Sequence, residues 1–125
     1  MRKYVHSIGY ALSGLSHAVT TERNFPLFIG AYILSLIAGL FLQLDLQQFA
    51  IVILSGGMFL AIELLNTALE RFADAFDTHT RKQDDVHHKA IKRTKDVAAG
   101  AALIAILAWI GAFVFTVWPN IMAFL

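Results

Sequence analysis

The chain has 125 residues, 58% of them hydrophobic, and a mean hydropathy of +0.63. A soluble domain of this length is far more polar, so the composition predicts an integral membrane protein, all-helical, with one domain over residues 1–125. The net charge of +1 indicates no nucleic-acid partner, and the absence of cysteine excludes disulfides and thiolate chemistry. No cleavable signal peptide is evident, because the segment after Arg2 and Lys3 is amphipathic and has no apolar core.

The first helix is expected over about residues 2–20. Its apolar residues recur every three or four positions, and Lys, His and Ser side chains occupy the other faces. The apolar positions are Val5, Ile8, Leu12, Leu15 and Val19. The segment is too polar to span a bilayer, so we place it on the membrane surface as an amphipathic helix. The alternative is a packing helix of a soluble domain, but the chain has little soluble domain for it to pack against.

Three apolar segments follow, and we expect transmembrane helices at about residues 27–44, 49–69 and 97–118. Asn24 is a plausible N-cap for the first of them, and Pro26 is tolerated in a first helical turn.

Polar sequence separates these spans. A tight turn around Asp45 joins the first two, and the second helix is expected to continue to about Phe76 as an amphipathic extension. A cytoplasmic loop is expected at about residues 77–95, and Pro119 with Asn120 should end the third span.

Basic residues predict the topology. All ten Lys and Arg lie either before the first span or between the second and third, and the short turn and the C-terminal tail have none. The positive-inside rule therefore places the N-terminus and the long loop in the cytoplasm and the C-terminus outside. We expect a multi-pass membrane protein.

The end of the second span carries an unusual polar face. Glu63, Asn66 and Glu70 are three and seven positions apart, which brings them onto one side of a helix. Ionisable groups at membrane depth are costly and indicate a functional site. Glu63 lies deepest, where a carboxylate can take a proton from a hydroxyl. Glu70, nearer the cytoplasm, is suited to Mg²⁺ that holds substrate phosphates, and Asn66 between them can orient either partner.

Three further residues extend this candidate site. Glu22 should lie at the same depth as Glu70, so it is a candidate second carboxylate for the metal. Lys95 supplies positive charge for phosphate oxygens, and Asp96 can orient Lys95 or accept from a ribose or base. Phosphoryl transfer needs this combination of metal, cation and base.

Simpler interpretations stand beside these. Glu63 and Asn66 can pair across helices, Glu22 and Glu70 can be hydrated headgroup-level residues, Lys95 can extend to the interface, and Asp96 can be an N-cap. His79, His87 and His88 with Asp84 and Asp85 could suggest zinc, but their spacing favours a solvated loop.

Two other functions remain open. A small oligomeric transporter or channel would use Glu63 and Asn66 as an ion or proton relay, but it leaves Lys95 and Asp96 unexplained. A purely structural membrane subunit leaves the whole polar face unexplained.

The segments ELLNTALE (63–70) and KDVAAGA (95–101) closely resemble the bacterial membrane diacylglycerol kinase family, which includes undecaprenol kinases. The resemblance covers nearly the whole chain. It implies a homotrimeric helical bundle of the bacterial inner membrane, with active sites between subunits, which phosphorylates a lipid hydroxyl with MgATP. The residues of both motifs are more similar to the undecaprenol kinase branch than to the diacylglycerol kinase branch.

The resemblance also implies roles for matching positions. Glu63 would be the general base, Glu22 and Glu70 would bind Mg²⁺, and Asn66 would support them. Nucleotide contacts would come from Lys95 and Asp96, with Tyr10 and His88 as further contacts, and Lys3 matches a basic residue of the surface helix. The loop between Glu70 and Lys95 is about two helical turns longer than in the better-known members, and Pro26 falls where the surface helix meets the first span.

Overall fold

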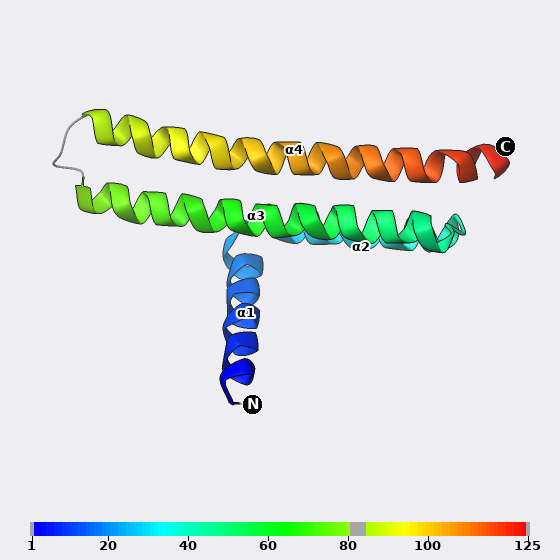
Figure 1. The fold of residues 1–125 in the computed structure, drawn as a ribbon, viewed down its shortest axis with the longest axis horizontal. Helices are drawn as coiled ribbons and strands as arrows, with labels where there is room; N and C mark the ends of the chain where they lie inside the picture. Colours follow the sequence, from blue (N-terminus) through cyan, green and yellow to red (C-terminus); the bar gives the residue numbers. More distant parts are fainter. Residues whose placement is uncertain (1, 81–84, 125) are drawn as a thin grey trace.

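The computed structural model describes residues 2–80 and 85–124, and within them the side chains of residues 6–77 and 88–123. The described chain forms four α-helices, α1 (Arg2–Thr21), α2 (Phe25–Phe41), α3 (Leu46–Thr80) and α4 (Asp85–Phe124), without a strand. Helices α2, α3 and α4 lie side by side, and α1 projects away from them near the middle of α3 (Figure 1). The predicted all-helical class is confirmed.

Two helices, α3 and α4, are long and apolar enough to cross a membrane. Helices α1 and α2 meet at a bend of 105°, and this bent pair passes the same test when it is taken as one further span. Helix α2 alone has 17 residues, which is the lower limit for crossing a bilayer. The bend gives α1 a direction different from that of the apolar helices.

The turn between α2 and α3 is built from local polar contacts. Gln43 adopts a left-handed conformation with φ of 54°. Asp45 and Gln48 form a capping box: Asp45 Oδ1 accepts from the Gln48 backbone N–H at 2.8 Å, and Gln48 Oε1 accepts from the Asp45 N–H at 2.9 Å. Asn120 of α4 joins this turn by donating to the Leu42 carbonyl at 3.0 Å and accepting from Gln48 Nε2 at 3.1 Å.

Helices α3 and α4 run antiparallel over most of their lengths. Phe59 of α3 stacks on Trp109 of α4 with ring centroids 5.4 Å apart, and Asp74 of α3 meets Lys95 of α4 closer to the α3–α4 connection. Between these two contacts, the buried residues of α4 are small. They are Ala98, Ala102 and Ala105. Helix α4 therefore presents small side chains at the level of the polar segment of α3.

Gly56 permits the closest approach of the three apolar helices. A Cβ placed on Gly56 would lie under 3.0 Å from the Tyr32 ring of α2 and from Trp109 Nε1 of α4. Tyr32 also donates its hydroxyl proton to the Ile53 carbonyl at 3.0 Å, and its ring packs edge-on against Trp109 at 6.1 Å. A side chain larger than hydrogen at position 56 would separate these groups.

Several boundaries differ from those expected. The structure continues α3 to Thr80 and begins α4 at Asp85, so most of the segment expected as a loop at 77–95 is helical; residues 81–84 lie outside the described part. Polar side chains are compatible with a helix where they face water or pair across to a neighbouring helix, as Asp77 and His88 do at 3.2 Å.

The expected helix ends also need correction. Pro119 lies inside α4, which runs on to Phe124. A proline so near the end removes few backbone hydrogen bonds, and Asn120 is held by the α2–α3 turn. Asn24 occupies the N-cap position of α2, but its side chain makes no capping hydrogen bond. Asp96 lies well within α4, so its interpretation as an N-cap is wrong.

Candidate active site

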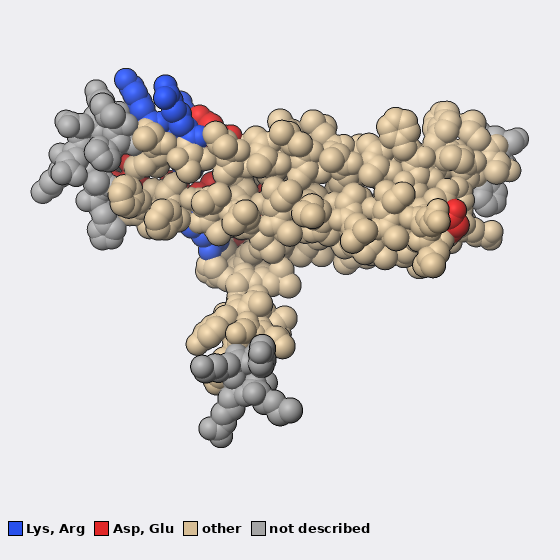
Figure 2. Space-filling model, viewed as in Figure 1, with Lys and Arg blue, Asp and Glu red and all other residues tan. Residues whose placement is uncertain are grey.

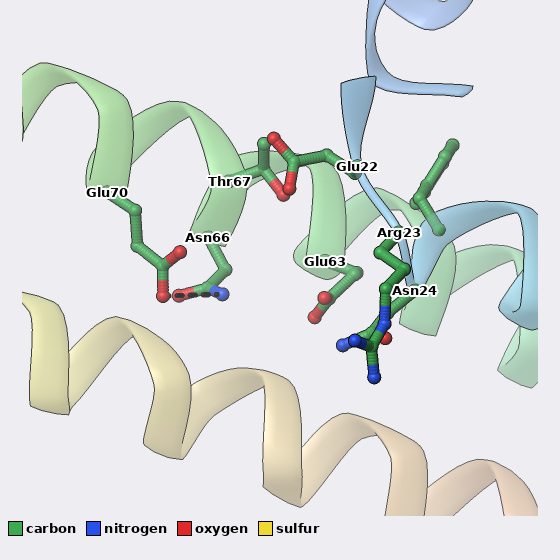
Figure 3. A pocket seen from close by; sticks show the side chains of 8 residues that line it. Glu22, Arg23, Asn24, Glu63, Asn66, Thr67 and Glu70 are labelled. Atoms are coloured by element: carbon green, nitrogen blue, oxygen red, sulfur yellow. Dashed lines mark hydrogen bonds between the residues drawn. The ribbon is translucent and has the colours of Figure 1, made fainter. Parts of the chain in front are cut away.

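Four of the polar residues predicted from the sequence line one cavity. Glu63, Asn66 and Glu70 extend from the same side of α3, and Glu22 reaches them from the link between α1 and α2 (Figure 3). The cavity has a volume of about 450 Å³. Its other lining residues are Arg23, Asn24, Phe25 and Thr67. The periodicity of α3 thus places three of these groups together, and the 105° bend before α2 supplies the fourth.

Asn66 is the buried member of the group, with 9% of its surface exposed. Its Nδ2 donates to Glu70 Oε1 at 3.4 Å, a long contact that orients the carboxylate. Its Oδ1 is buried and has no hydrogen-bond partner among the residues that the structure describes. A buried acceptor without a partner carries a free-energy penalty of about 1–3 kcal/mol, so it favours a ligand that can donate to it or coordinate with it.

Glu22 is held by a residue that sequence reasoning did not single out. Arg71 of α3 donates to Glu22 Oε1 through Nε at 3.1 Å and through Nη2 at 2.5 Å, and Nη2 also contacts Thr21 Oγ1. The guanidinium group is about one-third exposed, at 38%. Arg71 directly follows Glu70 in the sequence, but nothing in its local pattern indicated a partner 49 residues earlier.

Lys95 and Asp96 line a second, smaller cavity of about 210 Å³ with His88. Lys95 Nζ donates to Asp74 Oδ1 at 2.7 Å, and His88 Nδ1 lies 3.2 Å from Asp77 Oδ1. Asp74 lies eleven residues beyond Glu63 on α3, which is about 16 Å along the helix axis. Within one chain, therefore, the nucleotide candidates and the deepest carboxylate occupy different cavities.

Tyr10 lies in neither of these two cavities. It lines a groove between α1 and α3, together with His17 and Arg71, and 77% of its surface is exposed. The structure does not bring it to the carboxylates or to Lys95. The side chain of Lys3 lies outside the described part of the chain, so its predicted role has no structural counterpart here.

The carboxylate cavity fits a magnesium–phosphate complex. Three carboxylates and the unpartnered Asn66 Oδ1 are hard oxygen donors, which Mg²⁺ prefers. Among the described side chains, no three His, Cys, Asp or Glu groups lie close enough together to hold a metal alone. Mg²⁺ commonly takes one or two carboxylates and completes its shell with phosphates and water, so this donor set suits a metal that arrives with a nucleotide.

Comparison with known proteins agrees with this chemistry. Residues 9–117 match the prokaryotic diacylglycerol kinase family. An undecaprenol kinase of Bacillus subtilis is 35% identical over 105 residues, which is 83% of this chain and 79% of that protein. A diacylglycerol kinase of Synechocystis is 36% identical over 82% of this chain, which spans about half (55%) of that longer protein. The diacylglycerol kinase of Escherichia coli K12 is 25% identical, covering 94% of this chain and 91% of that protein.

The fold and the match together define a membrane-embedded helical enzyme of the lipid kinase class. The chain belongs to the prokaryotic diacylglycerol kinase family. With two or three helices able to cross a bilayer, it is a bacterial membrane protein.

Proposed function

We propose that this enzyme transfers the γ-phosphate of MgATP to the hydroxyl of a membrane lipid alcohol. The observation that carries the proposal is the single cavity that Glu22, Glu63 and Glu70 line together with the buried Asn66. The cavity has more carboxylates than basic side chains, and this excess of negative charge favours binding of a metal ion together with phosphates. Its position beside apolar helices favours a lipid as the phosphate acceptor. A channel or transporter would leave Lys95 and Asp96 unexplained.

Glu63 is the proposed general base. It lies two helical turns deeper in the apolar sequence than Glu70, which suits a hydroxyl held at headgroup level. Its carboxylate takes the hydroxyl proton while the lipid oxygen forms a bond to the γ-phosphorus. The bond between the γ-phosphorus and the β–γ bridging oxygen breaks, and ADP leaves.

Glu22 and Glu70 are the proposed metal-binding residues, and Asn66 orients Glu70 through its Nδ2 contact. Magnesium, when bound, offsets the negative charge that develops on the transferring phosphoryl group. These side chains hold the phosphates close to the Glu63 end of the cavity, where the transferring group can meet the lipid hydroxyl.

Lys95 and Asp96 are the proposed nucleotide contacts, with His88 beside them. Since they lie away from Glu63 within one chain, we propose a homotrimer in which α4 of one subunit brings these residues to the carboxylates of the next. Support comes from an exposed stripe on α3 with heptad spacing, which includes Leu54, Met58, Leu65 and Phe72. Such a stripe is typical of helices that pack against copies of themselves.

The proposed sidedness follows the charge. In the view of Figure 2, basic side chains gather toward the connected ends of α3 and α4, whereas no basic side chain is visible among the described residues at the opposite end of the bundle. We place the charged end, the N-terminus and the active site in the cytoplasm, where ATP is, and the C-terminus outside. Tyr10 is proposed to approach the nucleotide from α1, which we place on the membrane surface.

The acceptor is proposed to be diacylglycerol or undecaprenol, the lipids in the names of the relatives, with phosphatidic acid or undecaprenyl phosphate as the product. The test is transfer of labelled γ-phosphate from MgATP by purified protein in detergent micelles, with both lipids offered in parallel. Label in either lipid supports the proposal, and the ratio of rates identifies the preferred acceptor. An intact, folded protein that labels neither lipid in the presence of Mg²⁺ contradicts it.

A further inference from the structure

Arg71 makes the contact that joins the bend between α1 and α2 to the rigid helix α3. Its Nε and Nη2 both donate to one oxygen of Glu22, Oε1, and Nη2 also contacts the hydroxyl of Thr21. Thr21 in turn donates to the His17 carbonyl at 2.7 Å, so the last turn of α1 is included in this network. One guanidinium group thus links the end of α1, the bend and α3.

This contact decides where Glu22 can point. Glu22 follows the last residue of α1 and precedes α2, so no regular helix fixes its side chain, although its backbone N–H donates to the Ala18 carbonyl at 2.9 Å. A long, flexible side chain at such a place has many rotamers to lose when it binds a ligand. Both donors of Arg71 use Oε1, and among the side chains that the structure describes the Oε2 atom of Glu22 has no recorded hydrogen bond, so it is available to a ligand.

Charge gives Arg71 a second effect. The cavity is lined by three carboxylates, whose mutual repulsion disfavours their gathering before a cation arrives. Arg23, which lines the cavity, and Arg71, which lies outside it, each offset part of that repulsion, and of the two only Arg71 has a recorded contact with Glu22 among the described residues. A guanidinium group can also contact a carboxylate and a hydroxyl at once in a fixed plane, which the point charge of lysine does less well.

We propose that Arg71 is a positioning residue for the metal–nucleotide complex: it holds Glu22 at the carboxylate cavity with one oxygen directed to bind. This inference rests on the proposed function, because it assumes that Glu22 meets the metal. In this role Arg71 makes no direct contact with the substrate. The role gives a function to the basic residue that directly follows Glu70.

The test is binding of Mn²⁺, a paramagnetic substitute for Mg²⁺, measured by electron paramagnetic resonance with a non-hydrolysable ATP analogue. Arg71→Gln should raise the dissociation constant of Mn²⁺ about tenfold, the lower end of the range for residues that orient metal ligands, because the pair is partly exposed. Arg71→Lys should give an intermediate rise. In the same preparations, the apparent KM for Mg²⁺ in phosphate transfer should rise in parallel, with a smaller fall in kcat.

Two comparisons separate positioning from stability. Arg93→Gln removes the same charge from an exposed position of α4 and should leave Mn²⁺ binding unchanged. Adding Arg71→Gln to Glu22→Gln should weaken Mn²⁺ binding little further, because the group to be positioned is already altered. The inference is overturned if Arg71→Gln lowers the thermal stability while Mn²⁺ binds as in the parent, or if Mn²⁺ binds more tightly.

If Arg71→Gln does not fold, the Mn²⁺ dissociation constant of Arg71→Lys is the test. A value equal to that of the parent contradicts the inference. The proposed function fails in a different way, namely when the parent protein itself neither binds Mn²⁺ with the nucleotide nor labels a lipid. If the parent protein binds Mn²⁺ with the nucleotide and labels a lipid, but Arg71→Gln has the same Mn²⁺ affinity as the parent, then only the positioning role of Arg71 is contradicted.

Discussion

Lys95 of α4 donates a 2.7 Å hydrogen bond to Asp74 of α3, about one helical turn beyond Glu70. The proposed phosphate-binding cation is therefore already paired with a carboxylate of the neighbouring helix. The Lys95 side chain is about one-third exposed and that of Asp74 about two-thirds, so the pair is hydrated and adds little to the stability of the fold. Nucleotide phosphates can compete with Asp74 for this ammonium group.

Asp74→Asn should lower the apparent KM for ATP by about two- to fivefold, because the Lys95 ammonium group then binds the phosphates without competition from the Asp74 carboxylate. Lys95→Met should raise the same KM strongly and lower kcat. Steady-state kinetics in micelles, with ATP varied at saturating lipid, measures both. An unchanged or higher KM in Asp74→Asn would show that Asp74 supports Lys95 instead of competing for it.

Gly56→Ala should destabilise the bundle by about 1–3 kcal/mol, because its methyl group would overlap the Tyr32 ring and Trp109 Nε1. Thermal unfolding in detergent should show a lower Tm, with loss of the Tyr32 hydrogen bond to Ile53 as the local cause. Gly57→Ala is the matched control: its nearest neighbour, the Tyr32 hydroxyl, would lie 3.9 Å away. Equal Tm values for the two variants would mean that the close packing at Gly56 is not as described.

Asn120→Ala should also lower stability, by about 1–3 kcal/mol, because it leaves the Leu42 carbonyl and the Gln48 side-chain amide without their present partner. The effect should be seen in thermal unfolding and not in the KM for ATP, since Asn120 lies at the opposite end of the bundle from Lys95. Gln47→Ala, an exposed neighbour in the first turn of α3, serves as the control. A variant with parent-like Tm would show that water replaces Asn120 without cost.

Much of the fold followed from apolar periodicity. The helix at about 2–20 and the helix at about 27–44 were expected within three residues of their ends, because a long run of apolar residues leaves few alternatives. The apolar parts of α3 and α4 were located, but α4 begins twelve residues before and ends six residues after the expected span at 97–118. Most of the segment at residues 77–95 is helical, which was not expected. Composition alone does not distinguish a solvated loop from a helix whose polar side chains pair with those of an adjacent helix. The contact of Asp77 with His88 is of this kind.

The candidate site was partly accessible to the same reasoning. Glu63, Asn66 and Glu70 share a face because their spacing is that of a helix, and this needs no tertiary information. Arg71 and Asp74 were missed because their importance comes from partners on other elements, Glu22 and Lys95. The roles of all these residues in binding and catalysis stay predictions until they are measured.

The most direct test of the account is labelled phosphate transfer from MgATP to lipid by Glu63→Gln, compared with the parent and with Asp45→Asn. Both variants replace a carboxylate with an amide, but Asp45 lies in the α2–α3 turn, where asparagine remains a good N-cap. We expect Glu63→Gln to lose at least about a hundredfold in kcat while it assembles and binds Mn²⁺ with nucleotide, and Asp45→Asn to retain parent-like turnover. Near-parent turnover by a folded Glu63→Gln enzyme would contradict the assignment of Glu63 as the base.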